Sequence, residues 1–274
     1  MSKPIIWLFE KDVFDEGNPE DMARIATGMG DEVHWVGYVP FGGDLRLPPL
    51  GKDDCVLAYG TINLARRLLS TSPCSPVAWF DENSLRCSTY LSHWGRHSVQ
   101  EYVLVTWAEL RRQGDMLYDA LAEDGCLFFR PDNNLKTFPG KLVPREEFVH
   151  WHEMESDCHS PEACSLVMVS RPVNIAEEWR FVVRRGEVIS GSFYKQQGRI
   201  CLNPAWDERA RILALEISRE PWQPAPIYVL DVCQTRSGDF RLLEIGCVNT
   251  AGLYSCDLEK VVSAMRKQAI DELS

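Results

Sequence analysis

Apolar and polar positions along the first hundred residues predict strands and helices in alternation. The strand-like apolar runs cover residues 4–9, 32–39, 55–59 and 77–80, and the helix-like segments cover residues 19–27 and 62–69. Strands that alternate with helices favour a layer built on a parallel sheet. We therefore expect a small α/β unit at the start of the chain, with a loop rich in Gly and Pro over residues 41–53.

A helix-start signal at Thr106 opens the second part of the chain. Thr106 and Glu109 form a capping box ahead of apolar positions at helical spacing, so we expect a helix that reaches residue 123 and stops at Gly125. The elements expected after it are a strand at 126–130, a glycine loop at 131–141, a helix at 144–155, a strand at 165–169, a strand pair turning at 185–186, a helix at 206–219, a hairpin with strands at 227–233 and 240–245, and a last helix with Leu258, Val261, Met265 and Ala269 on its apolar face.

Residues 81–102 show no clear periodicity. They hold four basic side chains, namely Arg86, His93, Arg96 and His97. Two interpretations stay open, a basic loop that faces a substrate and a solvated surface loop.

Composition places the chain among ordinary water-soluble globular proteins, because 45% of its 274 residues are hydrophobic and 25% are charged. No apolar run approaches the ~18 residues that a membrane-spanning helix needs, and the first residues lack the features of a signal peptide. We expect a cytoplasmic protein that does not enter a membrane.

The net charge of −11 disfavours a broad interface with nucleic-acid phosphates. Ten cysteines are scattered without a CxxC pair, and several lie inside apolar runs. Reduced thiols that pack as small apolar side chains explain this usage.

The predicted hairpin near the C-terminus carries two acids among apolar neighbours. Asp231 interrupts its first strand and Glu244 its second, and Asn249 follows in a loop. Buried carboxylates need cations, and these oxygen donors suit Mg²⁺, which is usually shared with substrate phosphates. The alternative is that the acids pair with Arg236 or Arg241, or face solvent at a sheet edge.

Basic residues follow the strand at 126–130. Arg130 ends this strand, and Lys136 and Lys141 lie in the loop after it, with Gly140. Backbone N–H groups and fixed cations in such a loop can bind a polyphosphate, although the P-loop motif GxxxxGK(S/T) is absent from the sequence. The alternative is a solvated strand end and turn.

Charged and apolar residues alternate further along. Glu178 and Arg180 alternate with Trp179 and Phe181, which puts the two charges on one face of a strand. On a cleft wall, Glu178 can accept a hydrogen bond from a ribose hydroxyl, while Arg180 and Lys195 can neutralise phosphate or acyl-phosphate oxygens. A salt-bridged sheet face exposed to solvent gives the same pattern.

One tract has the residue types of a zinc site: His150, His152, Cys158, His159 and Cys164. Its spacing fits no standard zinc finger. His150 and His152 lie two positions apart, about 200° around a helix, and so face opposite sides. A helix end followed by a solvated loop is the favoured interpretation.

Taken in order, these features resemble the ATP-grasp superfamily of carboxylate–amine ligases. The shared order is a basic strand with a glycine loop, a hinge strand, a Glu-containing hairpin with a distal lysine, and an Asp strand paired with a Glu strand that leads into an Asn loop. The resemblance covers residues 127–273, and the first hundred residues resemble the α/β domain that precedes the grasp fold. It implies an α/β N-terminal layer at residues 1–105 followed by an α+β ATP-grasp fold at residues 106–274.

The resemblance implies that ATP and Mg²⁺ lie between two α+β lobes. The implied nucleotide-binding residues are Arg130, Lys136, Lys141, Ser170, Arg171, Pro172, Val173, Glu178 and Lys195. Residues 170–173 would meet adenine, Glu178 the ribose and the lysines the phosphates. The implied metal ligands are Asp231, Glu244 and Asn249, and the implied catalytic residues are Arg180, which would hold an acyl phosphate, and Lys195.

Two positions differ from the family pattern. The usual metal motif is Glu-x-Asn, whereas Gly246 stands two positions after Glu244 and the nearest asparagine is Asn249. Arg130 stands where the family usually has a lysine, which keeps the charge and adds bidentate geometry.

The implied activity is ATP-dependent formation of an amide or peptide-type bond through an acyl phosphate, with release of ADP and phosphate. The implied partners are a small-molecule or peptide carboxylate and an amine, and a homodimer is one option for assembly. A kinase-like phosphotransferase, a nucleotide-binding regulatory module and a zinc-binding interaction protein are the alternatives.

Overall fold

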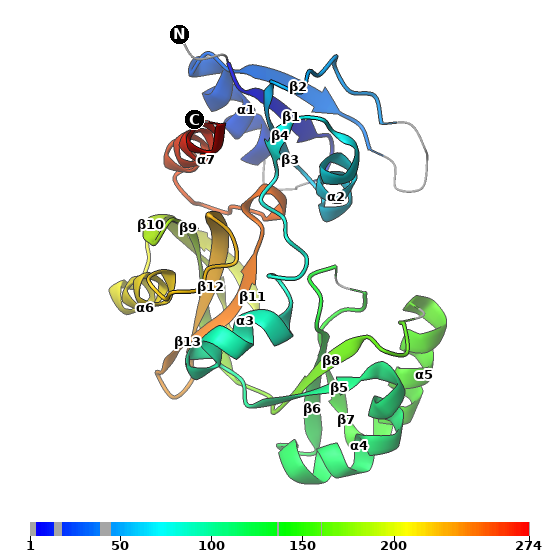
Figure 1. Cartoon of the computed structure of the whole chain (residues 1–274). Helices are drawn as coiled ribbons and strands as arrows, with labels where there is room; N and C mark the ends of the chain where they lie inside the picture. The colour runs from blue at the N-terminus through cyan, green and yellow to red at the C-terminus, as the bar shows by residue number, and fades with distance from the viewer. Residues whose placement is uncertain (1–3, 14–17, 39–44, 136, 160, 274) are drawn as a thin grey trace.

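The computed structural model describes residues 4–13, 18–38, 45–135, 137–159 and 161–273. Three sheets organise the chain (Figure 1). The N-terminal sheet is parallel throughout, in the order β2-β1-β3-β4. Its elements are β1 (Ile6–Glu10), α1 (Asn18–Gly28), β2 (Glu32–Val36), β3 (Cys55–Tyr59), α2 (Ile62–Thr71) and β4 (Ser75–Val77). The predicted α/β unit with a parallel sheet is confirmed.

The C-terminal helix α7 (Leu258–Leu273) returns to this N-terminal unit. It packs beside α1, so both ends of the chain lie at the same unit (Figure 1). Its predicted apolar face is buried, with Val261 and Met265 fully shielded from solvent. These side chains share one core with Trp7 and Phe9 of β1.

The second sheet is antiparallel, in the order β5-β8-β6-β7. Its elements are β5 (Tyr102–Thr106), α4 (Trp107–Leu121), β6 (Cys126–Pro131), β7 (Lys141–Pro144), a 3₁₀ turn (Arg145–Glu147), α5 (Phe148–His159) and β8 (Leu166–Ser170). The Thr106 hydroxyl accepts a hydrogen bond from the Glu109 N–H at 3.3 Å, as the capping box predicted. Gly125, with a φ of +72°, follows the helix end.

The third sheet is also antiparallel, in the order β11-β10-β9-β12-β13. Its elements are β9 (Ile175–Arg184), β10 (Glu187–Gln196), β11 (Arg199–Asn203), α6 (Glu208–Ser218), β12 (Ile227–Thr235), β13 (Phe240–Gly246) and a 3₁₀ turn (Val248–Thr250). One face of this sheet packs under α6 in an apolar core that includes Trp179 and Phe181. The opposite face carries the charged residues.

Residues 81–102 contain a helix that the sequence analysis did not predict. Helix α3 (Cys87–Trp94) packs on the third sheet through Cys87, Tyr90, Leu91 and Trp94. This spacing is that of one helical face, so the conclusion that the segment lacks periodicity was wrong. Its basic side chains lie at the surface beside acids or rings: Arg86 near Glu82, Arg96 and His97 near Glu220, and His93 on Trp222.

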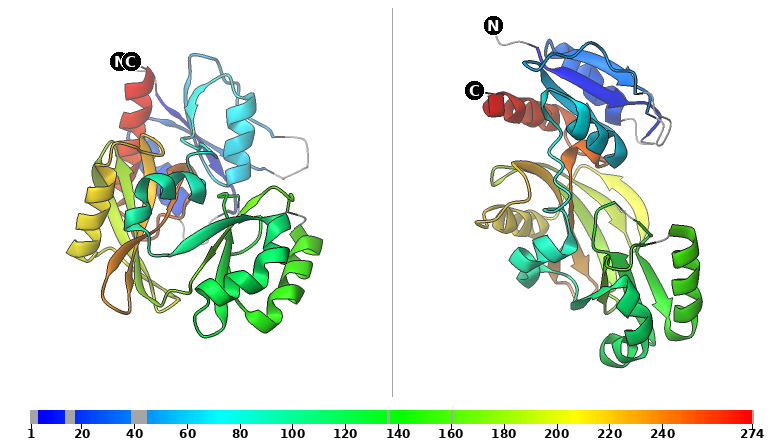
Figure 2. Two further views of the ribbon diagram at one scale, coloured as in Figure 1. Left: turned by 60° about the horizontal axis from the view of Figure 1, so that its bottom comes forward. Right: turned by 45° about the vertical axis from the view of Figure 1, so that its right-hand side comes forward.

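The second and third sheets, with their helices, form two lobes that lie side by side (Figure 2). We propose a division of the chain into two units near residue 105. Strand β5 spans that position, and α7 belongs by its contacts to the first unit. No helix in the described ranges has both the length and the apolar content to cross a membrane.

Candidate functional site

Strand register aligns three charged residues across the third sheet. Arg180 on β9 lies opposite Asp231 on β12, and Asp231 lies opposite Glu244 on β13. Directly opposed residues share a face. Glu178 lies two positions before Arg180 and opposite Lys195 on β10, so it joins the same face, as the alternation along β9 predicted.

Two β-bulges add side chains to this face. The register of β9 against β10 shifts between Phe193 and Lys195, so Tyr194 is the extra residue and both Tyr194 and Lys195 reach the charged face. A second shift, on β13, makes Leu243 the extra residue, so Leu243 and Glu244 both line the same cavity. Bulges commonly re-aim side chains next to binding sites.

Arg180 is fixed by three hydrogen bonds. Its Nε and Nη2 donate to the two carboxylate oxygens of Asp231 at 2.8 and 2.7 Å, and its Nη1 donates to the Gly252 carbonyl at 2.7 Å. The guanidinium also lies 5.0 Å from the ring centroid of Tyr254 and 5.6 Å from that of Tyr194. A guanidinium has five N–H groups, so this arrangement sets its orientation and leaves two for a ligand.

The Arg180–Asp231 pair is deeply buried, with side-chain exposures of 11% and 1%. Burial lowers the pKa of Arg180, but the charge and hydrogen bonds of Asp231 outweigh burial and hold that pKa well above its ordinary value. Burial raises the pKa of Asp231, and Arg180 opposes the rise. Arg180 therefore stays cationic, with Asp231 as its counter-charge.

Tyr194 links this pair to a second one. Lys195 Nζ lies 3.2 Å from a Glu178 carboxylate oxygen, and the Tyr194 hydroxyl donates to the other Glu178 oxygen at 2.6 Å. The same hydroxyl lies 3.3 Å from Asp231. Burial, Asp231 and Glu178 raise the pKa of Tyr194, so its hydroxyl keeps its proton and acts as a hydrogen-bond donor.

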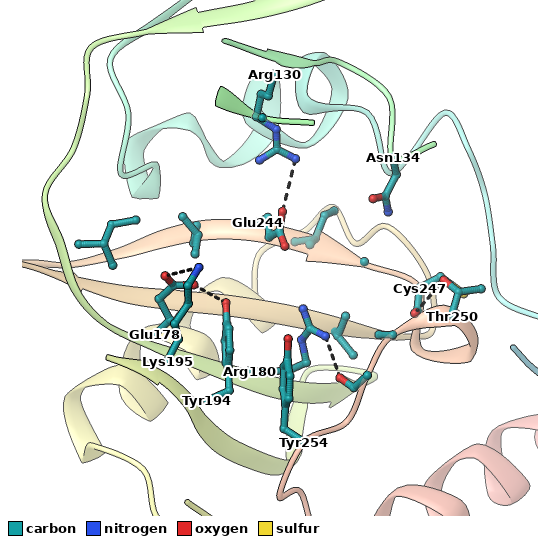
Figure 3. A pocket seen from close by; sticks show the side chains of 18 of the residues that line it. Arg130, Asn134, Glu178, Arg180, Tyr194, Lys195, Glu244, Cys247, Thr250 and Tyr254 are labelled. Atoms are coloured by element: carbon teal, nitrogen blue, oxygen red, sulfur yellow. Dashed lines mark hydrogen bonds and ion pairs between the residues drawn. The ribbon is translucent and has the colours of Figure 1, made fainter. Parts of the chain in front are cut away.

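Arg130 faces this charged surface from the second sheet. Its Nη2 lies 3.4 Å from a Glu244 oxygen, which bridges β6 and β13 across the space between the lobes (Figure 3). Burial lowers the pKa of Arg130, but Tyr90, Cys87 and Glu244 more than offset this and raise it above its usual range. Arg130 is thus a fixed cation.

These side chains surround a cavity of about 680 Å³. Its size falls within the range of roughly 300–1,000 Å³ typical of sites for small ligands. Both lobes contribute to its walls, and Ile62 of α2 and residues 250–252 and Tyr254 complete them. Figure 3 shows Arg130 above the cavity, with Glu178, Lys195, Tyr194, Arg180 and Tyr254 rising from the third sheet.

The structure brings together six of the predicted site residues at this cavity: Arg130, Val173, Glu178, Arg180, Lys195 and Glu244. Four other predicted residues are not among those that line it: Lys141, Ser170, Arg171 and Pro172. Lys141 and Arg171 are exposed, whereas Ser170 is fully buried. Lys136 lies outside the described residues.

Two of the three predicted metal ligands are engaged elsewhere. Both carboxylate oxygens of Asp231 bind Arg180, in place of the pairing with Arg236 or Arg241 considered from the sequence. The Asn249 amide oxygen accepts from the Trp79 N–H at 3.0 Å, and its amide nitrogen donates to the Ala58 carbonyl at 2.7 Å. Asn249 is fully buried and holds the chain against the N-terminal sheet, so the structure does not bring it to the cavity.

Glu244 is the predicted metal ligand that does line the cavity. Mg²⁺ is commonly bound through one or two carboxylates together with substrate phosphates, so a carboxylate opposite fixed cations fits this ion. Within the described residues, no group of three or more His, Cys, Asp or Glu side chains could hold a metal by itself.

The zinc-like tract has a different explanation for one of its members. The ring of His152 stacks on Trp107 with a centroid distance of 4.4 Å, and burial lowers the pKa of His152. His150, Cys158 and Cys164 are exposed. Of His159, the described structure covers the backbone.

Tyr194, Tyr254 and Asn134 line the cavity but were not predicted from the sequence. Tyr194 depends on a bulge, and Tyr254 has a φ of +51° and stacks on Tyr194 with a centroid distance of 4.5 Å. Asn134 lies in the glycine loop, where the sequence analysis singled out only the lysines. An amide beside a proposed phosphate loop was the available signal.

Comparison with known proteins identifies the family to which this architecture corresponds. Residues 105–264, more than half of the chain, match the family model for an ATP-grasp domain, the second family of its clade. No curated protein sequence matches the chain.

Solved structures share the fold across nearly the whole chain. The D-cycloserine synthetase DcsG superposes with a TM-score of 0.66 at 12% identity, covering 96% of this chain and 99% of that one. D-alanine–D-alanine ligase from Bacillus anthracis gives 0.59 at 12% identity, with coverages of 99% and 96%. The ATP-grasp ligase PsnB, in complex with minimal precursor, Mg and ADP, gives 0.54 at 11% identity, with coverages of 97% and 98%.

Proposed function

The chain belongs to the ATP-grasp family, and from this premise we propose that it is an ATP-dependent ligase that joins a carboxylate to an amine. In the first step, a substrate carboxylate oxygen attacks the γ-phosphorus of ATP, the bond to the β,γ-bridging oxygen breaks, and ADP leaves. In the second, the amine attacks the carbonyl carbon of the acyl phosphate and loses a proton, and inorganic phosphate departs with the electron pair of the C–O bond.

The observation that carries this proposal is the convergence of three cations on one cavity between two lobes. Arg130, Arg180 and Lys195 line it, and each is held by an acid that sets its position. Phosphoryl transfer asks a protein mainly to position the reactants and to neutralise charge on oxygens. Cations fixed before the substrate arrives supply that neutralisation without reorganisation during the reaction.

We assign Arg180 to the acyl phosphate. Its two remaining N–H groups border the cavity, while Asp231, Gly252 and two aromatic rings prevent it from turning away. Arg130 and Lys195 approach from different sheets, so together they can hold a polyphosphate between the lobes. Glu178, which accepts from Tyr194, is our candidate for the ribose hydroxyls.

Mg²⁺ fits beside Glu244, and when bound it supplies positive charge to the phosphates. The carboxylate of Glu244 lies opposite Arg130, so the metal and the guanidinium would share the neutralisation of the nucleotide. For the substrate we propose an amino-acid or peptide carboxylate, which is the class suggested by the names of the D-alanine–D-alanine ligase and of the PsnB complex with its precursor.

The test is a screen for nucleotide products with Mg²⁺ and ATP over amino acids, short peptides and polyamines, followed by mass spectrometry of the products. Our proposal predicts ADP and phosphate, formed only when both a carboxylate and an amine are supplied, and a product joined by loss of water. A phosphorylated substrate would indicate a kinase-like phosphotransferase. Nucleotide binding without turnover on any combination would indicate a regulatory module.

A further inference from the structure

Gly246 leaves a space on the cavity wall that the backbone does not require. It lies two positions after Glu244 on β13 and lines the same cavity. It is absent from the glycines of this structure that have a positive φ, so its conformation is open to other residues. Its lack of a side chain therefore matters for the room it creates.

Two neighbours border that room. A Cβ atom at position 246 would lie 3.1 Å from Cγ2 of Val229 and 4.0 Å from the amide nitrogen of Asn134. Val229 is the strand partner of Gly246 on β12. Asn134 comes from the other lobe, in the loop between β6 and β7, and reaches over the third sheet (Figure 3).

Asn134 differs from the other asparagines near the site in having an uncommitted amide. Asn133 accepts a hydrogen bond from the Leu135 N–H at 3.1 Å, and Asn249 uses both ends of its amide. The Asn134 side chain makes no hydrogen bond to any residue that the structure describes, yet it lines the cavity with Glu244. A polar side chain held over a cavity in this way is available to a ligand.

We propose that the amide oxygen of Asn134 is a Mg²⁺ ligand supplied across the cleft, beside Glu244 and in the place that a side chain at position 246 would otherwise take. This assignment rests on the proposed function. Amide oxygens are ordinary ligands of hard cations, and this one belongs to a different lobe from Glu244. Metal binding would then tie the loop between β6 and β7 to the third sheet, so the same event that loads the metal would bring the two lobes together over the phosphates.

The test measures Mn²⁺, as a paramagnetic substitute for Mg²⁺, bound to the complex of the protein with a non-hydrolysable ATP analogue. Asn134→Ala should weaken Mn²⁺ binding by about tenfold or more, the scale on which metal sites respond to loss of a supporting group. Affinity for the nucleotide in the presence of EDTA should stay unchanged. Asn133→Ala, in the same loop, is the matched control and should leave Mn²⁺ affinity near that of the wild type.

Two further variants separate a metal ligand from a hydrogen-bond donor. Asn134→Asp keeps the oxygen and removes the N–H group, so it should retain Mn²⁺ affinity; loss equal to that of Asn134→Ala would overturn the assignment. Gly246→Asn in the Asn134→Ala background should restore part of the affinity from the opposite side. Gly246→Ala measures the cost of the contact with Val229 alone.

The failure of this inference is distinguishable from the failure of the proposed function. If the wild type shows no metal-dependent nucleotide binding, the proposed function is wrong and the assignment falls with it. If the wild type binds Mn²⁺ with nucleotide and Asn134→Ala binds it equally well, only the assignment of Asn134 is wrong. A melting scan of Asn134→Ala confirms that any loss is measured on folded protein.

Discussion

Replacing Arg180 by alanine should destabilise the protein as well as inactivate it. The substitution leaves the Asp231 carboxylate, with a side-chain exposure of 1%, without its counter-charge. Breaking a buried ion pair from one side typically costs about 3–5 kcal/mol of unfolding free energy. At roughly 2–4 °C per kcal/mol for a large domain, Arg180→Ala should lower Tm by about 6–20 °C.

Removing both partners together separates stability from chemistry. Arg180→Met combined with Asp231→Leu replaces the pair by apolar side chains of similar length, a change that is often neutral or stabilising when a buried pair is involved. Tyr194 keeps its 2.6 Å hydrogen bond to Glu178 in this variant. We therefore expect a Tm close to that of the wild type but no turnover, because the two N–H groups assigned to the acyl phosphate are lost.

The assay combines thermal melting, nucleotide affinity and single-turnover ADP formation for the wild type, the single variants and the double variant. A double variant that melts normally, binds nucleotide and fails in the chemical step would match a group that acts mainly in the transition state. Wild-type melting of Arg180→Ala would refute the buried-pair argument. Retained turnover in the double variant would refute the assignment of Arg180 to the acyl phosphate.

Two further predictions concern Glu244 and the cysteines. Glu244→Gln keeps the shape of a partly exposed side chain, so it should change unfolding free energy by less than about 1 kcal/mol, while the rise in Tm on adding Mg·ATP should disappear; strong destabilisation with activity retained would make Glu244 a structural partner of Arg130. Burial raises the pKa of Cys247 to about 12, so at pH 8 iodoacetamide should alkylate exposed Cys201 well before Cys247, as peptide mass spectrometry can show. Because this folded-state pKa lies above the ordinary value of 9.0, its contribution to stability is complete below pH 9 and falls as pH rises toward 12. Rapid labelling of Cys247 in folded protein would contradict the burial argument.

The order of elements and the charged face of β9 could be predicted because they depend on local patterns. Glu178 and Arg180 share a face by simple alternation, and Thr106 and Gly125 mark the two ends of α4 through local backbone chemistry. The pairing of Arg180 with Asp231 could not be predicted, because it depends on which strands are neighbours and in what register, 51 residues apart in sequence.

Other parts of the site depend on departures from regular structure. Tyr194 enters the cavity through a bulge, and a bulge changes the face of a side chain without leaving a clear mark in the hydrophobic pattern. Helix α3 starts where Asp132, 44 residues away, accepts a hydrogen bond from the Ser88 N–H at 2.6 Å, so no local cap announced it. Asn249 matched an expected ligand type, but its surroundings are set by the N-terminal sheet, which packs against it only in the folded chain.

The most direct test of the account is to trap the acyl phosphate with hydroxylamine. The protein is incubated with Mg²⁺, ATP and a panel of amino-acid and peptide carboxylates, with hydroxylamine in place of the unknown amine, and both the hydroxamate and the nucleotide product are quantified. The account predicts hydroxamate in equal amount to ADP and phosphate for the accepted carboxylate, and neither product from the Arg180→Met, Asp231→Leu variant. Hydroxamate accompanied by AMP and pyrophosphate would show an acyl adenylate in its place and contradict the central claim.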